Sequence, residues 1–266
     1  MRRMIKRAVN YLLNAFGIEM SRAGAAAVKD AKIFDATREA VNLYCETTVS
    51  SLPPLNDIQI ELLVERCGTT IGEALYILEG IHKTKHLPGH ICEFGIAQGA
   101  TSVQMAYMIL NTDKHLYLLD SFEGLSRPHD KDELIDDIFK LGSIEAYAGK
   151  MATPLDVPAA RLKSINFPDV RIHFIKQKIE GELKELDKLP QEVAFAYFDM
   201  DLYEPTLLSL QWFDTVASTG SIAVVDDYGF FSTGVEKAVK EFLEGRKYKI
   251  TIPVKSAGHF CLLEKL

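Results

Sequence analysis

Four aspartates follow two apolar segments in the second half of the chain. Asp199 and Asp201 come after residues 193–198, and Asp226 and Asp227 come after residues 221–225. Apolar runs of this length, rich in β-branched and aromatic residues, are typical of buried parallel strands. The carboxyl ends of parallel strands border the ligand crevice of an open α/β sheet. We therefore expect the four carboxylates to meet in one crevice.

Carboxylates that converge in this way repel one another unless a cation lies between them. Their hard oxygen ligands suit Mg²⁺, Mn²⁺ or Ca²⁺ better than a soft metal. The alternative is that each aspartate caps the helix that follows its strand, as aspartate commonly does. The repetition of acids at two neighbouring strand ends favours a metal site over four separate caps.

A glycine-bearing turn lies between two further strand-like segments, residues 90–94 and 115–120. Gly95 and Gly99 allow the backbone to approach a ligand closely, and the helix expected over residues 101–110 would offer free N–H groups. Asp120, at the end of the second segment, is placed to accept hydrogen bonds from ribose hydroxyls. The spacing is E-x-G-x-x-x-G from Glu93, not G-x-G-x-x-G. It indicates an adenosine-bearing cofactor and argues against a dehydrogenase.

Residues 121–169 form a long insertion before the next strand-like segment, and insertions of this length are typical of lids or substrate-binding elements. We expect a helix over residues 135–149. His129 is the one histidine of the insertion and would suit a general base, because imidazole titrates near neutrality. Gln177 and Lys178 follow the third strand, where they could contact an adenine ring, and they precede an expected helix over 181–186.

The composition is that of an ordinary globular protein. The chain has 266 residues, of which 47% are hydrophobic and 25% charged, and its net charge of −7 gives no sign of nucleic-acid binding. Its four cysteines show no C-x-x-C spacing, so we expect reduced thiols in a cytoplasmic protein. No apolar stretch is long enough to span a bilayer.

The first 22 residues are basic and amphipathic, with apolar residues at helical spacing. We expect this segment to pack in a homo-oligomer or against the rest of the chain. Peripheral membrane contact through residues 1–20 is an alternative, because a basic amphipathic helix can lie on anionic lipid. A signal peptide is a third interpretation, weakened by a short and interrupted apolar run.

Four segments together resemble the macrocin-type O-methyltransferases of the TylF-like family: ICEFGIAQGATS, LLDSFEGL, FDMDLYEPT and GSIAVVDDYG. The resemblance covers about residues 45–266. It implies an α/β, Rossmann-like class I methyltransferase fold, with a seven-stranded, mostly parallel sheet whose last strand is antiparallel. It also implies an S-adenosylmethionine- and Mg²⁺-dependent O-methyltransferase that acts on a hydroxyl of a sugar or glycosylated small molecule.

The resemblance also implies roles for individual residues. The metal would be held by Asp199, Asp226 and Asp227, with Asp199 also catalytic, and the substrate contacted by Asp201, Tyr203 and Tyr228. The cofactor would be bound by Glu93, Gly95, Gly99, Asp120, Ser121, Gln177 and Lys178. The base of well-studied relatives is a histidine of the insertion, but this insertion does not align with theirs. His129 is therefore a candidate, followed by Asp201 and Lys150.

These observations predict two parts, an N-terminal helical extension over residues 1–85 and a cofactor-binding domain over 86–266 with a lid over 121–169. The alternatives are another nucleotide-binding Rossmann-like protein or a non-catalytic module that keeps the fold as a scaffold. The crowded acids disfavour a bare scaffold, which would not need them.

Overall fold

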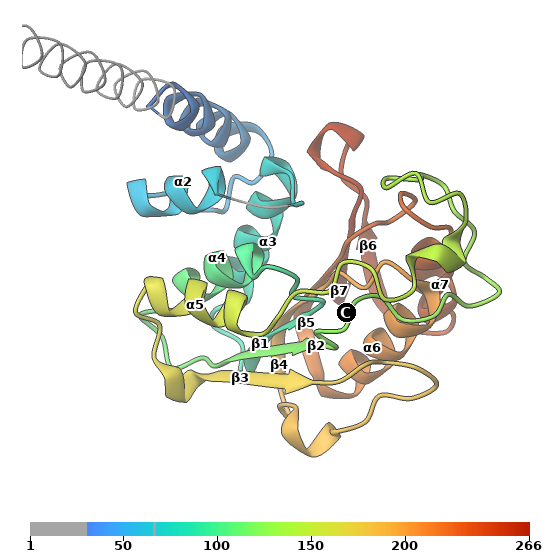
Figure 1. Cartoon of the computed structure of the whole chain (residues 1–266). Helices are drawn as coiled ribbons and strands as arrows, with labels where there is room; N and C mark the ends of the chain where they lie inside the picture. Colours follow the sequence, from blue (N-terminus) through green and yellow to red (C-terminus); the bar gives the residue numbers. More distant parts are fainter. Residues whose placement is uncertain (1–30, 66–67) are drawn as a thin grey trace, which may run out of the picture.

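The computed structural model describes residues 31–65 and 68–266. In this part of the chain seven strands form one sheet in the order β3-β2-β1-β4-β5-β7-β6 (Figure 1). They are β1 (His90–Phe94), β2 (Leu116–Asp120), β3 (Ile172–Lys176), β4 (Val193–Phe198), β5 (Ala217–Val225), β6 (Tyr248–Thr251) and β7 (Cys261–Lys265). Strand β7 runs antiparallel to β5 and β6, and the other pairings are parallel. The predicted sheet is therefore confirmed, with β6 at its edge.

Helices cover both faces of the sheet. They are α2 (Asp57–Val64), α3 (Ile71–Thr84), α4 (Ala100–Met108), α5 (Asp156–Ser164), α6 (Tyr203–Val216) and α7 (Gly234–Leu243), with short 3₁₀ turns η1 (Ile144–Tyr147), η2 (Asp169–Arg171), η3 (Leu186–Lys188) and η4 (Lys255–Ala257). One apolar core joins α6 and α7 to the sheet, and a second joins α3, α4 and α5 to its opposite face. No helix of the described residues is long and apolar enough to cross a membrane.

The burial of strand β4 explains why its sequence is apolar without interruption. All six of its residues are buried. Ala196 and Phe198 pack into the core under α6 and α7, whereas Phe195 and Tyr197 pack into the core under α3 and α4. A strand buried on both faces shows no alternation of polar and apolar residues. Asp199 is the first polar residue beyond its carboxyl end.

Helix α3 connects the N-terminal helices to the sheet. Its Leu75 and Leu78 pack against α2 and the helical residues 31–47, while its Ile77 and Ile81 pack on the sheet. Residues 31–47 project from the rest of the molecule in Figure 1. The division into 1–85 and 86–266 stays a prediction, and the predictions for residues 1–22 fall outside the described residues.

The helix expected over residues 135–149 is wrong. The segment contains only the 3₁₀ turn η1, because the Asp137 carboxylate accepts hydrogen bonds from the backbone N–H groups of Leu141 and Gly142 and from the Tyr147 hydroxyl. Side-chain acceptors of this kind compete with the helical pattern. Gly142 has a φ of 84°, in the left-handed region, which ends any helix there.

The helix expected over residues 181–186 is also wrong, and η3 is the only helical turn described between β3 and β4. Gly181 and Glu185 have φ values of 71° and 55°, which helical backbone does not adopt. The Gln177 side-chain amide lies against the backbone N–H and carbonyl of Lys184. The Gln177 side chain therefore occupies the Lys184 N–H and carbonyl, which would bond to other backbone groups in a helix.

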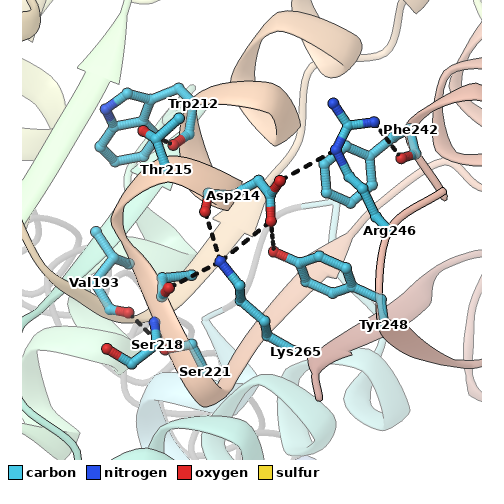
Figure 2. Close-up of polar contacts among 11 residues, drawn as sticks. Val193, Trp212, Asp214, Thr215, Ser218, Ser221, Phe242, Arg246, Tyr248 and Lys265 are labelled. Atoms are coloured by element: carbon cyan, nitrogen blue, oxygen red, sulfur yellow. Dashed lines mark hydrogen bonds and ion pairs between the residues drawn. The ribbon is translucent and has the colours of Figure 1, made fainter. Parts of the chain in front are cut away.

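Asp214, near the end of α6, ties the antiparallel end of the sheet to the helices (Figure 2). Its carboxylate accepts hydrogen bonds from Arg246 Nε at 3.1 Å and from the Tyr248 hydroxyl at 2.9 Å, and Lys265 Nζ lies 3.2 Å away. Lys265 Nζ also donates to the Ala217 carbonyl at 3.0 Å. Burial raises the pKa of Asp214, but these donors outweigh it and the net change is a lowering. The carboxylate therefore stays charged and fixes β6 and β7 to α6.

Candidate functional site

A cavity of about 410 Å³ opens at the carboxyl ends of β1, β2, β4 and β5. The sheet order reverses between β1 and β4, and ligands of open α/β sheets bind at such a point. All four aspartates that follow β4 and β5 line the cavity, as do Gly95 and Asp120 on the other side. The structure thus brings the four acids together, as the sequence predicted, and places the glycine turn in the same site.

Three of the acids form a compact group. One carboxylate oxygen each from Asp199, Asp201 and Asp227 lies within 4.8 Å of the other two. Asp226 instead places one oxygen 3.0 Å from the buried Tyr197 hydroxyl, which donates to it. All four side chains are half-buried. The family resemblance implied Asp199, Asp226 and Asp227 as the metal ligands, and that choice among the four stays a prediction.

The backbone that presents the acids continues the sheet and then turns sharply. The N–H of Asp199 donates to the Phe94 carbonyl at 2.8 Å, and the N–H of Asp226 donates to the Phe198 carbonyl at 2.9 Å. Asp201 and Asp227 have φ values of 60° and 55°, in the left-handed region that residues other than glycine seldom adopt. Left-handed backbone of this kind is concentrated at functional sites and persists where neighbouring contacts hold it.

Burial and mutual repulsion raise the pKa of every acid in the group. Burial and then the charges of Asp226 and Asp201 raise the pKa of Asp199 well above its ordinary value. Burial and the same kind of repulsion raise the pKa of Asp227. A set of hard carboxylate oxygens that repel one another in a buried cavity fits a divalent cation such as Mg²⁺.

Asp201 gives a prediction for the metal-free protein. Burial, followed by the charges of Asp226 and Asp120, raises the pKa of Asp201 from 3.8 to about 6 despite its hydrogen bond with Asp227. The Asp201 carboxyl group therefore contributes fully to the stability of the fold below about pH 4, where it is protonated. This contribution is lost as the pH rises through 6. In EDTA, Asp201→Asn should gain stability relative to wild type between pH 4 and 7, by at most about 3 kcal/mol. Urea unfolding at several pH values measures this, and a pH-independent difference would contradict it.

The glycine turn after β1 is set by close backbone packing. Gly95 has a φ of 80°, and a side chain there would overlap the Asp199 carbonyl oxygen. Gly99 has a φ of 74° and precedes α4, where a side chain would overlap Pro158. Glu93 is buried, and its carboxylate accepts a hydrogen bond from the Ser102 hydroxyl at the start of α4. Glu93 is thus not among the residues that line the cavity, and it supports the turn from behind.

Asp120 joins two loops at the edge of the cavity. Its Oδ2 accepts hydrogen bonds from the N–H groups of Ile96 at 2.7 Å and Ala97 at 3.3 Å. Its Oδ1 accepts one from the N–H of Phe122 at 2.6 Å. The carboxylate therefore shapes the turn after β1 and also faces the cavity.

The remaining predicted site residues divide into two groups. Ser121, Gln177 and Lys178 line the cavity. His129, Tyr203 and Tyr228 do not: the His129 Nδ1 accepts the Lys131 N–H at 3.1 Å, and the Tyr203 hydroxyl bonds Lys131 and Glu241. The backbone N–H of Tyr228 donates to the His259 carbonyl at 2.7 Å. Their roles stay predictions.

Sequence reasoning missed the apolar part of the cavity wall. It includes Leu125, Ile138, Met151, Pro205, Phe230 and Phe231. Three of these residues lie in the lid insertion, where single apolar residues between turns show no periodicity. The Leu125 N–H donates to the Lys150 carbonyl at 2.9 Å, which brings residue 150 back to the beginning of the lid. The pattern that could have found these residues is a set of apolar side chains in an otherwise polar insertion.

Two sequence comparisons give relatives of the chain. Residues 76–263 match the sequence model described as Macrocin-O-methyltransferase (TylF). A protein of Streptomyces olivaceus named 8-demethyl-8-(2,3-dimethoxy-alpha-L-rhamnosyl)-tetracenomycin-C 4'-O-methyltransferase is 27% identical over 149 residues, which are 53% of this chain and 54% of that protein. The chain thus spans about half the length of the curated relative that it matches.

Solved structures resemble the fold. The O-methyltransferase NovP matches with a TM-score of 0.62 and 16% identity over 85% of this chain and 99% of that chain. CalS11, a calicheamicin methyltransferase, matches with a TM-score of 0.57 and 21% identity over 86% of this chain and 91% of that chain. At these identities the likeness concerns the fold alone, and it agrees with the Rossmann-like arrangement predicted from the sequence.

Proposed function

Because the chain belongs to the macrocin-O-methyltransferase (TylF) family, we propose that it transfers a methyl group from S-adenosylmethionine to a hydroxyl of a sugar or glycosylated small molecule, with the help of Mg²⁺. Membership confirms the resemblance drawn from the four motifs, and the class I methyltransferase fold is confirmed with it. The observation that carries the proposal is that one cavity holds both the acid group and the glycine turn with Asp120. The named sugar-bearing acceptor of the Streptomyces olivaceus relative supports a sugar here.

The glycine side of the cavity is the proposed cofactor site. Gly95 allows close approach, Asp120 would accept from ribose hydroxyls, and Gln177 and Lys178 would lie against the adenine. Ser121 lines the same wall, while Gly99 and Glu93 fix the turn. When bound, S-adenosylmethionine supplies an electrophilic methyl group on a sulfonium. The residues named above orient the cofactor. The lid residues Leu125, Ile138 and Met151 exclude water from the methyl group.

The acid side of the cavity is the proposed metal and acceptor site. Asp199, Asp226 and Asp227 would hold Mg²⁺, which supplies positive charge that lowers the pKa of a nearby hydroxyl. Asp201 would contact the acceptor. Tyr203 and Tyr228 are proposed to contact its outer part. The protein's own contribution is positioning, because it holds the acceptor oxygen and the methyl donor in one cavity.

A base must take the hydroxyl proton as the new carbon–oxygen bond forms and the carbon–sulfur bond breaks. His129 and Asp201 are the two proposed bases. Asp201 lines the cavity, which supports it, whereas His129 would need the lid to carry its imidazole inward. Lys150 is exposed on the lid and comes after them.

We expect Asp201→Asn to lower kcat by about 100- to 10,000-fold, the range that general bases contribute. Its amide keeps the size and shape of the carboxyl group but cannot accept the proton. Rates of methyl transfer across pH 6 to 9 measure the effect. A loss of that size in His129→Ala, with Asp201→Asn retaining its activity, would assign the base to His129.

A binding measurement tests the proposed function without a known acceptor. Thermal unfolding with S-adenosylhomocysteine, NAD and MgCl₂ added separately should show stabilisation by the first and the third, because ligands that bind the folded state stabilise it. Stabilisation by NAD alone would favour another nucleotide-using enzyme and overturn the proposal.

Three wider proposals concern the whole protein. We propose that residues 1–22 pack in a homo-oligomer, with peripheral membrane contact through 1–20 as the alternative. The acidic net charge of −7 supports a small-molecule substrate rather than nucleic acid. Cys45, Cys92 and Cys261 are free thiols, which supports a cytoplasmic location.

A further inference from the structure

Tyr197, the fifth residue of β4, is a fully buried tyrosine whose hydroxyl faces two acids. The hydroxyl lies 3.0 Å from Asp226 Oδ2 and 3.2 Å from Glu73 Oε1. Its ring packs in the core between the sheet and α3. A hydroxyl carries one proton, so it donates to one of the two acids at a time, and the shorter contact is with Asp226.

Both oxygens of Asp226 are thereby held by the protein. Oδ1 accepts the N–H of Asp227 at 2.7 Å, and Oδ2 accepts the Tyr197 hydroxyl. Each carboxylate oxygen keeps a second lone pair, so these bonds leave capacity for a ligand. Asp226 also shares a side-chain hydrogen bond with Glu73. Without the Tyr197 hydroxyl, the carboxylate would lose the donor to Oδ2 and would keep the Asp227 N–H and Glu73 as partners.

Glu73 closes the arrangement from the N-terminal side. It lies in the first turn of α3, is 3% exposed, and its N–H donates to the Thr70 hydroxyl that caps the helix, at 3.1 Å. The acid is therefore fixed in place 124 residues away in sequence from Tyr197. Helix α3 and β4 together position the hydroxyl, so its direction toward Asp226 is set by the packed core.

We propose that Tyr197, backed by Glu73, is a positioning residue that orients Asp226 for binding of Mg²⁺. The inference rests on the proposed function, because it needs a metal held by Asp199, Asp226 and Asp227. Hydrogen-bond partners behind metal ligands fix ligand orientation, and their loss costs about 10- to 100-fold in metal affinity. Neither residue stood out in the sequence, where Tyr197 is one aromatic residue of an apolar strand and Glu73 one acid of a helix.

Calorimetric titration of MgCl₂ into the full chain, saturated with S-adenosylhomocysteine, tests the inference. Tyr197→Phe removes only the hydroxyl, and we expect its Kd for Mg²⁺ to rise about 10- to 100-fold. Its affinity for S-adenosylhomocysteine should stay unchanged, because Tyr197 does not line the cavity. Tyr248→Phe is the matched control. It removes a tyrosine hydroxyl that donates to Asp214 at 2.9 Å (Figure 2). Neither residue lines the cavity, so this variant should leave the Kd for Mg²⁺ as in wild type.

The outcomes separate the two proposals. If wild type binds Mg²⁺ and Tyr197→Phe binds it equally well, the positioning role is overturned and the metal site stands. If both tyrosine variants lose affinity alike, the effect is general destabilisation and the inference fails. If wild type does not bind Mg²⁺, the proposed metal dependence fails and the inference fails with it.

A second measurement uses the wild-type protein and does not depend on the folding of a variant. With tyrosine labelled at the ring Cζ, MgCl₂ should shift the resonance of a buried tyrosine whose hydroxyl bonds a metal ligand. Binding of Mg²⁺ with no tyrosine resonance shifted would contradict the inference.

Discussion

Asp226→Asn is expected to lower methyl transfer by roughly 1,000-fold or more and to abolish stabilisation by Mg²⁺. The variant keeps the shape of the side chain but removes one charge from the proposed metal site. A metal ion supplies several kcal/mol of transition-state stabilisation, and about 4 kcal/mol corresponds to that loss in rate. Steady-state rates with saturating S-adenosylmethionine, and thermal unfolding with and without MgCl₂, measure the two effects.

The fold of this variant should survive. The Asp226 charge raises the pKa of Asp199 and Asp227, so removing it relieves repulsion in the metal-free protein. In EDTA, Asp226→Asn should therefore be at least as stable as wild type. Asp113→Asn, which removes one exposed acid outside this cavity, is the matched control and should keep activity and the response to Mg²⁺. A helix-cap role predicts the reverse, a loss of about 1 kcal/mol that is independent of metal.

Asp120→Ala should raise the Kd for S-adenosylhomocysteine by about 100-fold. Two hydrogen bonds from ribose hydroxyls to a charged acceptor, at about 1.5 kcal/mol or more each, correspond to that factor. The variant also removes the acceptor of the Ile96, Ala97 and Phe122 N–H groups, so the turn after β1 loses support. Isothermal titration calorimetry measures the affinity.

The control for Asp120 is Glu123→Gln, three residues further along the chain. Glu123 is 61% exposed and pairs with Lys176 rather than facing the cavity. The affinity of the Glu123→Gln variant for S-adenosylhomocysteine should equal that of wild type. An unchanged affinity in Asp120→Ala would show that the ribose lies elsewhere and would overturn the assignment of the cofactor site.

Much of the sheet could be predicted from local sequence. The uninterrupted apolar run at 193–198 predicted a strand buried on both faces, and β4 is buried throughout. Asp199 and Asp226 directly follow their strands, so parallel strand geometry was enough to predict that they would meet. Gly95 was predicted to let the backbone approach a ligand closely, and this stays a prediction. In the structure, a side chain at Gly95 would overlap the Asp199 carbonyl oxygen, so backbone packing also requires glycine there.

Other features depend on contacts that a local pattern does not contain. The expected helix over 135–149 is replaced by turns, because the Asp137 carboxylate accepts hydrogen bonds from backbone N–H groups and from the Tyr147 hydroxyl. The Asp226 carboxylate is contacted by Tyr197 and by Glu73, and Glu73 comes from a helix that is distant in the sequence. Residues that are far apart in sequence and chemically ordinary by themselves are beyond what spacing can predict.

The central claim is Mg²⁺-dependent methyl transfer to a sugar hydroxyl. The most direct measurement is transfer of an isotopically labelled methyl group from S-adenosylmethionine to a panel of glycosides, run with MgCl₂ and with EDTA. The account predicts label in at least one glycoside with MgCl₂, and its loss in EDTA. Label transferred at the same rate in EDTA would contradict the metal site formed by Asp199, Asp226 and Asp227.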